Sequence, residues 1–213
     1  MKLNTLVLAG AIALPVQYGS DWQLLKYSRL EANEVNFSRQ GMAVKVDQSA
    51  SPIIYPFDSP KTVTRVEVSG NLSNLLDLPS TQGQKGSDDF SLKIGLVISG
   101  DKTLNAFQRL FSAKWIRKLF DLAPEGTGVE KIYFLNAVQD ESLLGRQRQH
   151  PQSELIFENN VWLLDESGDF SLIHDLQDPQ QVIAIWLSID GDDTRSSYTT
   201  TIKSLLLKGS FDA

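Results

Sequence analysis

The chain has 213 residues, of which 41% are apolar and 22% are charged, a composition that can build the core of one medium-sized domain. Its formal net charge is −6 at pH 7, so phosphate groups are repelled overall and nucleic acid is excluded as the main partner. Cysteine is absent, which excludes disulfides, thiolate nucleophiles and zinc–thiolate sites.

The first residues have the features of an export signal. One positive charge at Lys2 precedes a mostly apolar stretch, Leu3–Val16, that contains the small-x-small triplet Ala11–Ala13. The stretch is shorter than the about 20 residues that span a membrane, and no integral membrane span is expected elsewhere. We therefore predict a signal peptide over residues 1–20, one domain over 21–213, and a periplasmic or secreted protein. The alternative is a buried first strand of an intracellular domain.

Beyond residue 20 the apolar residues recur with a period of two. Val44–Asp47 and Val63–Ser69 alternate between apolar and polar residues, which is typical of half-buried strands. Phe90–Ile98 and Val182–Ile189 are apolar over most of their length, as expected of central strands. Turn-forming residues separate these runs. The pattern predicts a mostly β protein, an antiparallel β-sandwich of the jelly-roll kind.

One substantial helix is expected over about residues 104–122. Its apolar residues recur every four positions and form one stripe: Phe107, Phe111, Trp115 and Leu119. Basic residues occupy the other face, and no acidic residue precedes Asp121. We expect the stripe to pack over one end or face of the sandwich. The alternative is an interfacial helix that lays its aromatic side chains against lipid.

No catalytic motif is visible. His174 alternates with apolar neighbours, as a sheet-face histidine does, and no Gly-x-Ser-x-Gly nucleophile motif is present. Glu158, Asp165 and Glu166 lie near one another in sequence, but acidic residues at turns are usually solvated. We therefore predict a protein that is not an enzyme, with no catalytic and no cofactor-binding residues.

A metal site is expected, if anywhere, in the turn after the strand that ends at Ile189. Asp190, Asp192 and Asp193 bring three carboxylates together around Gly191, and calcium prefers several oxygen ligands around a tight turn. Calcium bound there is expected to have a structural role. The alternative is an ordinary hairpin turn rich in aspartate and glycine.

Exposed aromatic side chains can stack on the flat faces of sugars, so they are candidates for ligand binding. Trp162 and Trp186 lie inside apolar strand runs and are assigned to the core. Trp22 and Tyr27 lie outside such runs, and they are therefore the candidate ligand-binding residues.

Three segments resemble a bacterial family of exported domains of unknown function. Asp88–Ile94 is similar to the family's Asp-Asp-aromatic strand, Trp115–Phe120 to a helix that precedes a turn and a strand, and Ile185–Thr194 to the family's close. The resemblance covers about residues 60–208. It implies a galactose-binding-like jelly roll and a periplasmic location, and the family has no assigned activity.

These features rank three functions. The leading prediction is an exported, non-enzymatic module that binds a carbohydrate or an envelope glycan, by analogy of fold. The alternative is a protein-interaction or structural component of the cell envelope, which an exposed apolar patch would support. A glycan hydrolase, which would need two carboxylates across a cleft, is the third. The identity of the ligand and the oligomeric state are not predicted.

Overall fold

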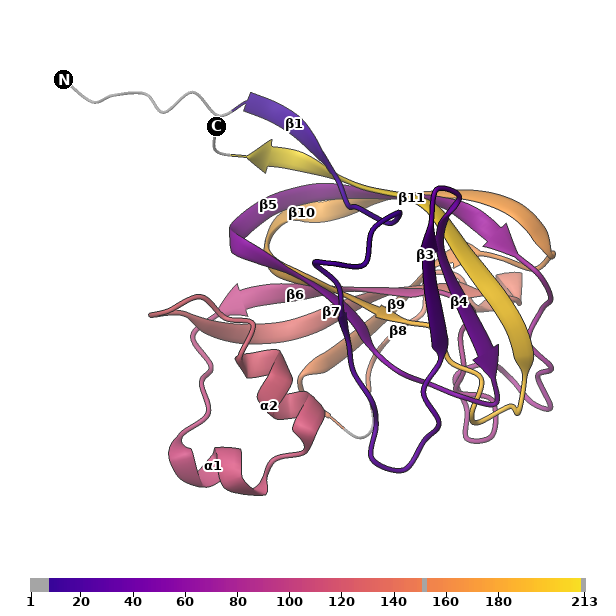
Figure 1. The fold of residues 1–213 in the computed structure, drawn as a ribbon, viewed down its shortest axis with the longest axis horizontal. Helices are drawn as coiled ribbons and strands as arrows, with labels where there is room; N and C mark the ends of the chain where they lie inside the picture. The colour runs from indigo at the N-terminus through magenta and orange to yellow at the C-terminus, as the bar shows by residue number, and fades with distance from the viewer. Residues whose placement is uncertain (1–7, 151–152, 212–213) are drawn as a thin grey trace.

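The computed structural model describes residues 8–150 and 153–211 and consists mainly of strands (Figure 1). The strands are β1 (Leu8–Ala13), β2 (Gln23–Leu24), β3 (Glu34–Ser38), β4 (Gly41–Asp47), β5 (Ile53–Leu72), β6 (Lys93–Gly100), β7 (Gly128–Val138), β8 (Gln147–Gln149), β9 (Ile156–Leu163), β10 (Gly168–Ser188) and β11 (Ser197–Phe211). The helices are α1 (Ala106–Phe111), α2 (Lys114–Phe120) and the short 3₁₀ turn η1 (Glu141–Leu143). The prediction of a mostly β protein is confirmed.

The described strands form one hydrogen-bonded sheet that folds into two layers. The order along the sheet is β3-β4-β11-β5-β10-β6-β7-β9-β8, while β1 pairs with β11 and β2 pairs with β5. β5 and β10 belong to both layers, and Figure 1 shows them curving from one layer to the other. Their pairing shifts register between Asp175 and Gln180 and between Val182 and Ala184, as bulges that bend a strand do. The pairs are antiparallel as predicted, except that β7 and β9 run parallel.

Two apolar clusters stabilise this arrangement. The larger one joins residues of both layers and forms the interior of the sandwich. The second lies on the outer face of β6, β7 and β10, where α2 covers it with Leu119 and Phe120. Successive residues of a strand point to opposite faces, so Leu96 of β6 belongs to the first cluster and Val97 to the second. The outer face of these strands is therefore partly covered by α2, and the rest of it is left for a surface site.

The predicted signal segment contributes to the fold from Leu8 onward. β1 pairs with β11, and the following Leu14 and Val16 are only 3% and 1% exposed. The carbonyl oxygen of Pro15 accepts a hydrogen bond from Nε1 of Trp22 at 3.2 Å. Residues 1–7 lie outside the described residues. Cleavage after about residue 20 stays a prediction.

The predicted helix over residues 104–122 is interrupted. At Ser112 the backbone is extended (φ −72°, ψ 150°), and its Oγ donates to the carbonyl oxygen of Gln108 at 2.6 Å, which ends α1. Trp115 and Leu119, in α2, pack on the sandwich. Phe107 and Phe111, in α1, are exposed. The expectation that the whole stripe covers the sandwich is therefore wrong. None of the helices in the described ranges is long and apolar enough to cross a membrane.

Deletion of residues 1–20 is expected to destabilise the domain, because it removes β1 and the buried side chains of Leu14 and Val16. Burial of two such side chains contributes roughly 3 to 5 kcal/mol, so the free energy of unfolding in urea should fall by at least about 3 kcal/mol. Deletion of residues 1–7 is the control. Equal stability of the two shortened proteins would contradict the role given to this segment. The N-terminus of the natural protein, read by mass spectrometry, tests the predicted cleavage separately.

Candidate functional site

An open cleft of about 1180 Å³ lies on the outer face of β6, β7, β9 and β10, next to α2. Its floor comes from β6, β7, β9 and β10. Its walls come from residues 26–30, from the loop 83–89, from the start of α2 and from the turn after β10, and Arg148 and His150 close one side. The cleft is thus assembled from segments that are far apart in the chain.

A row of polar side chains crosses the floor from strand to strand. Lys93 of β6 pairs with Ser188 of β10 on one side and with Asn136 of β7 on the other. Glu158 of β9 pairs with Arg148 of β8. The apolar part of the floor comes from the same strands: Ile132, Phe134, Ile156 and Trp186. The floor therefore has a polar half and an apolar half, as sites for amphipathic ligands do.

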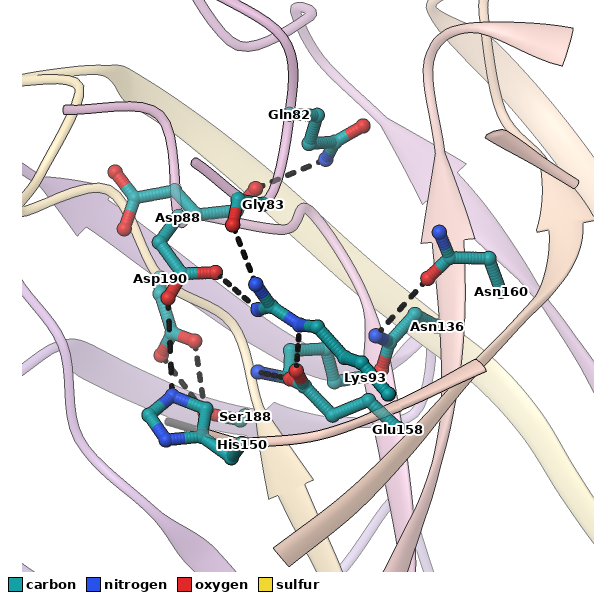
Figure 2. A network of polar contacts seen from close by, with 12 residues as sticks. Gln82, Gly83, Asp88, Lys93, Asn136, His150, Glu158, Asn160, Ser188 and Asp190 are labelled. Atoms are coloured by element: carbon teal, nitrogen blue, oxygen red, sulfur yellow. Dashed lines mark hydrogen bonds and ion pairs between the residues drawn. The ribbon is translucent and has the colours of Figure 1, made fainter. Parts of the chain in front are cut away.

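Lys93 and Glu158 form a buried ion pair (Figure 2). Nζ of Lys93 lies 2.8 Å from Oε1 of Glu158, and the two side chains are 9% and 1% exposed. Burial by itself lowers the pKa of Lys93, but the charge of Glu158 opposes it and the pKa is raised. Burial likewise raises the pKa of Glu158, but Lys93 and Arg148 outweigh it and the pKa is lowered. Each partner keeps the other charged in a place that disfavours an isolated charge.

Arg148 connects this pair to the loop 83–89. Its Nε donates to Oε2 of Glu158 and its Nη2 to Oδ1 of Asp88, both at 2.5 Å. Its Nη1 donates to the carbonyl oxygen of Gly83. Burial raises the pKa of Asp88, but its bonds to His150 and Arg148 outweigh this effect and lower it. Asp88, Arg148, Glu158 and Lys93, hereafter the ionic chain, alternate in charge, sum to zero and fix the loop to the floor.

Asp190 lies beside this network, and it forms no ion pair with any of the residues that the structure describes. Both of its carboxyl oxygens accept from Oγ of Ser188, at 2.8 and 2.9 Å, and the residue is 9% exposed. Burial raises the pKa of Asp190 to about 7, although Lys93 and Ser188 lower it in part. The same region raises the pKa of the Tyr27 hydroxyl, through burial first and then the negative charge of Asp190 and Asp192. The cleft therefore holds one carboxyl that gains or loses its proton near neutral pH.

The predicted calcium turn lies at the cleft, but it brings no ligand cluster together. Asp190 faces Ser188, and Oδ2 of Asp193 accepts from the backbone nitrogen of Asp88 at 2.9 Å. Across residues 8–150 and 153–211, no three acidic, histidine or cysteine side chains are placed to hold one metal ion. Calcium binding by Asp190, Asp192 and Asp193 stays a prediction, and a calorimetric calcium titration tests it.

The structure separates the two predicted ligand-binding aromatic residues. Trp22 is 6% exposed and packs against Tyr55 in the interior, with ring centroids 5.1 Å apart, so it is withdrawn as a stacking candidate. Its sequence neighbours gave no sign of burial because it precedes a strand of only two residues. Tyr27 is half-buried and lines the cleft. Trp115 lines it as well, with its ring edge-on to Trp186 at 6.5 Å.

Most of the ionic chain could not be read from the sequence, which places its members far apart. Of the carboxylates that lie close in sequence, Glu158 is buried whereas Asp165 and Glu166 are exposed. His174 packs edge-on against Trp162, with ring centroids 6.4 Å apart, and lies outside the cleft. One usable signal was Lys93 itself, because a cation inside an apolar strand needs a buried partner.

Comparison with known proteins adds little to this description. No family model matches the chain, so membership of the bacterial family that it resembles stays a prediction. No curated protein matches it. Among solved structures the chain is similar to a xylan-binding module, CBM15, with 11% identity and a TM-score of 0.40 over 96% of this chain and 99% of that one. Similarity at this level is too weak to support an assignment of function.

Glu158→Gln is expected to lower the free energy of unfolding by roughly 3 kcal/mol, because it leaves the buried Lys93 and the half-buried Arg148 without the carboxylate that they share. Urea denaturation at neutral pH measures the change. Glu166→Gln, in an exposed turn, is the matched control and should change stability by less than about 0.5 kcal/mol. If both variants lose the same small amount, the ionic chain does not stabilise the site.

The raised pKa of Asp190 predicts a pH-dependent difference in stability between the natural protein and Asp190→Asn. The folded protein holds the proton up to about pH 7 and the unfolded chain releases it near pH 4, so this residue favours folding less and less as pH rises between them. The amide side chain of the variant carries no charge and avoids that loss. Relative to the natural protein, the variant should therefore gain up to about 4 kcal/mol between pH 4 and pH 8.

Denaturation of both proteins across this pH range measures the gain, with Asp165→Asn at an exposed turn as the control. Titrations that are common to all three proteins cancel in the comparison. A difference between the natural protein and Asp190→Asn that stays constant with pH would show that Asp190 ionises normally.

Proposed function

We propose that the protein is a non-enzymatic module that binds a glycan in this cleft. The observation that supports the proposal is the combination of aromatic rings on the walls with fixed charged groups on the floor. Tyr27 enters from the segment before β3 and Trp115 from α2, both half-buried in the cleft lining. Sugars present apolar CH faces and polar hydroxyl edges, so a site that binds them needs both kinds of group.

The ionic chain gives the cleft rigid hydrogen-bonding groups. Asp88, Lys93 and Arg148 line the cleft while their charges are already paired within the protein. Groups held in place in this way lose little conformational entropy when a ligand binds, which favours affinity.

The rim adds four cations that have no ion-pair partner in the described part of the chain: Lys26, Arg29, Lys85 and Lys114. The same lining holds five aspartates, of which only Asp88 forms an ion pair in the described residues, so the charges of the lining do not by themselves select between neutral and acidic glycans. In an exported protein, as the N-terminal sequence predicts, such a ligand would be an envelope or extracellular glycan.

A glycan array that includes neutral and acidic sugars tests the proposal. Trp115→Ala and Lys114→Ala should each weaken binding of the best ligand by about tenfold or more, because each removes a group of the cleft lining. Tyr18→Ala is the matched control, since Tyr18 is 70% exposed and lies outside the lining. Circular dichroism checks that Trp115→Ala still folds.

Absence of binding to any glycan, or equal loss of affinity in all three variants, would contradict a glycan site in the cleft. Repeating the array with a calcium chelator examines the predicted calcium turn at the same time. Loss of binding on chelation would support a structural calcium at this turn.

A glycan hydrolase is the second candidate, and one observation favours it. Five aspartates line the cleft, and Asp190 holds its proton near neutral pH while Asp88 stays ionised, which is the division of roles between an acid and a base. Release of new reducing ends from a bound glycan, lost in Asp190→Asn, would favour the hydrolase. Binding without cleavage favours the module.

A further inference from the structure

Helix α1 presents an apolar surface to solvent. Phe107, Leu110 and Phe111 are 73%, 73% and 71% exposed, and none of the six residues of the helix is buried. The spacing i, i+3, i+4 places the three side chains on one face, where the two phenyl rings are 4.8 Å apart. Figure 1 shows α1 outside α2, away from the sheets. We name these three residues the α1 face.

Local hydrogen bonds hold this exposed helix in shape. Asn105 and Gln108 form a reciprocal capping box, with side chain to backbone distances of 2.8 and 2.9 Å. Nη1 of Arg117, in α2, donates to the carbonyl oxygens of Arg109 and Ser112 at 3.1 and 2.6 Å, which ties the end of α1 to α2. Because an isolated helix of six residues is not stable in water, these bonds are what keep the apolar residues together.

The charge around the α1 face is opposite to that of the whole protein. Residues 102–120 contain five cations and no acid, in a chain whose net charge is −6. Lys102 pairs with Glu130 and Arg109 with Asp121. The remaining three cations lie on α2 and have no carboxylate within salt-bridge distance in the part of the chain that the structure describes: Lys114, Arg117 and Lys118.

We propose that α1 and α2 form an interfacial site for an anionic phospholipid bilayer. The α1 face enters the boundary between headgroups and acyl chains, and the three unpaired cations of α2 lie at the level of the anionic headgroups. Large apolar side chains, together with cations that have no carboxylate partner, are the residue types that bind such an interface. The site shares Lys114 with the rim of the glycan cleft, but its apolar part, the α1 face, lies outside the cleft lining, and the proposal does not depend on the function proposed for the cleft.

Two observations favour lipid over a protein partner. Three large side chains at this exposure leave roughly 450 Å² in water, whereas each partner in a stable protein interface buries about 800 Å². The cations on α2 complement a surface of uniform negative charge, and they do not alternate with acids as they do where one protein surface must match another.

Sedimentation of the full chain with vesicles tests the proposal. The protein should bind vesicles of equal parts phosphatidylglycerol and phosphatidylcholine, bind phosphatidylcholine alone at least about tenfold more weakly, and lose binding as salt is raised. The triple variant Phe107→Ser, Leu110→Ser, Phe111→Ser should lose at least about tenfold in affinity while its circular dichroism is unchanged. The matched control is Tyr18→Ser, Leu24→Ser, Ile173→Ser, which removes three apolar residues that are 70%, 52% and 55% exposed.

Three outcomes would overturn the proposal. The natural protein fails to bind anionic vesicles; or the two triple variants bind equally well; or the α1 variant changes a concentration-dependent dimer into a monomer in light scattering. The last result would assign the α1 face to a second copy of the chain. Glycan binding by the α1 variant, measured in parallel, reports on the cleft separately.

Discussion

The site depends on one constraint: the charge of Lys93, buried on a sheet face, has to be balanced. A single ammonium group placed there would be far less stable than in water. Glu158 balances it at 2.8 Å, and Arg148 then balances the second oxygen of Glu158. The excess charge of Arg148 is in turn met by Asp88 at the cleft edge. Each charged side chain therefore needs an oppositely charged neighbour, and the series of ion pairs ends at Asp88, at the edge of the cleft.

This requirement explains the shape of the cleft. The pairs link β6, β9 and β8 with the loop 83–89, which the sheet alone would not position. A buried ion pair is not by itself strongly stabilising, because desolvation opposes the attraction between its charges. Its consequence here is geometric, since Arg148 holds the loop through both Asp88 and the carbonyl oxygen of Gly83. Asp190 is left outside the pairing, and for that reason burial raises its pKa to about 7.

Helix α2 joins the two surfaces of the molecule. Its first residues line the cleft, its Leu119 and Phe120 cover the outer cluster, and its Arg117 is hydrogen-bonded to the end of α1. A protein held at a bilayer through α1 would therefore carry its cleft close to the headgroups. Glycans that are attached to lipid or that lie near the membrane are then the ligands that both surfaces would reach together.

Local pattern predicted the strands well. The alternation of Val63–Ser69 lies within β5 and the apolar run Val182–Ile189 covers the end of β10, because one or two buried faces impose these patterns directly. No local sequence pattern indicated that β7 and β9 pair in parallel. The four-residue period also did not predict the break at Ser112, because it reports the spacing of apolar residues and not the hydrogen bond that ends a helix.

The site was predicted less well than the fold. Tyr27 lines the cleft, and its role in ligand binding stays a prediction, whereas Trp22 belongs to the interior, and its burial depends on segments distant in sequence. The ionic chain brings residues 88, 93, 148 and 158 together through three separate strands and a loop, and no spacing rule describes that arrangement.

The four tryptophans allow the most direct test of the glycan cleft. Trp115 and Trp186 line the cleft, whereas Trp22 and Trp162 lie in the interior cluster of the sandwich. Indole N–H signals recorded by NMR during titration with the best glycan from an array should move for Trp115 and Trp186 and stay in place for the other two. Shifts confined to Trp22 and Trp162, or binding without movement of the Trp115 signal, would contradict the assignment of this cleft as the ligand site.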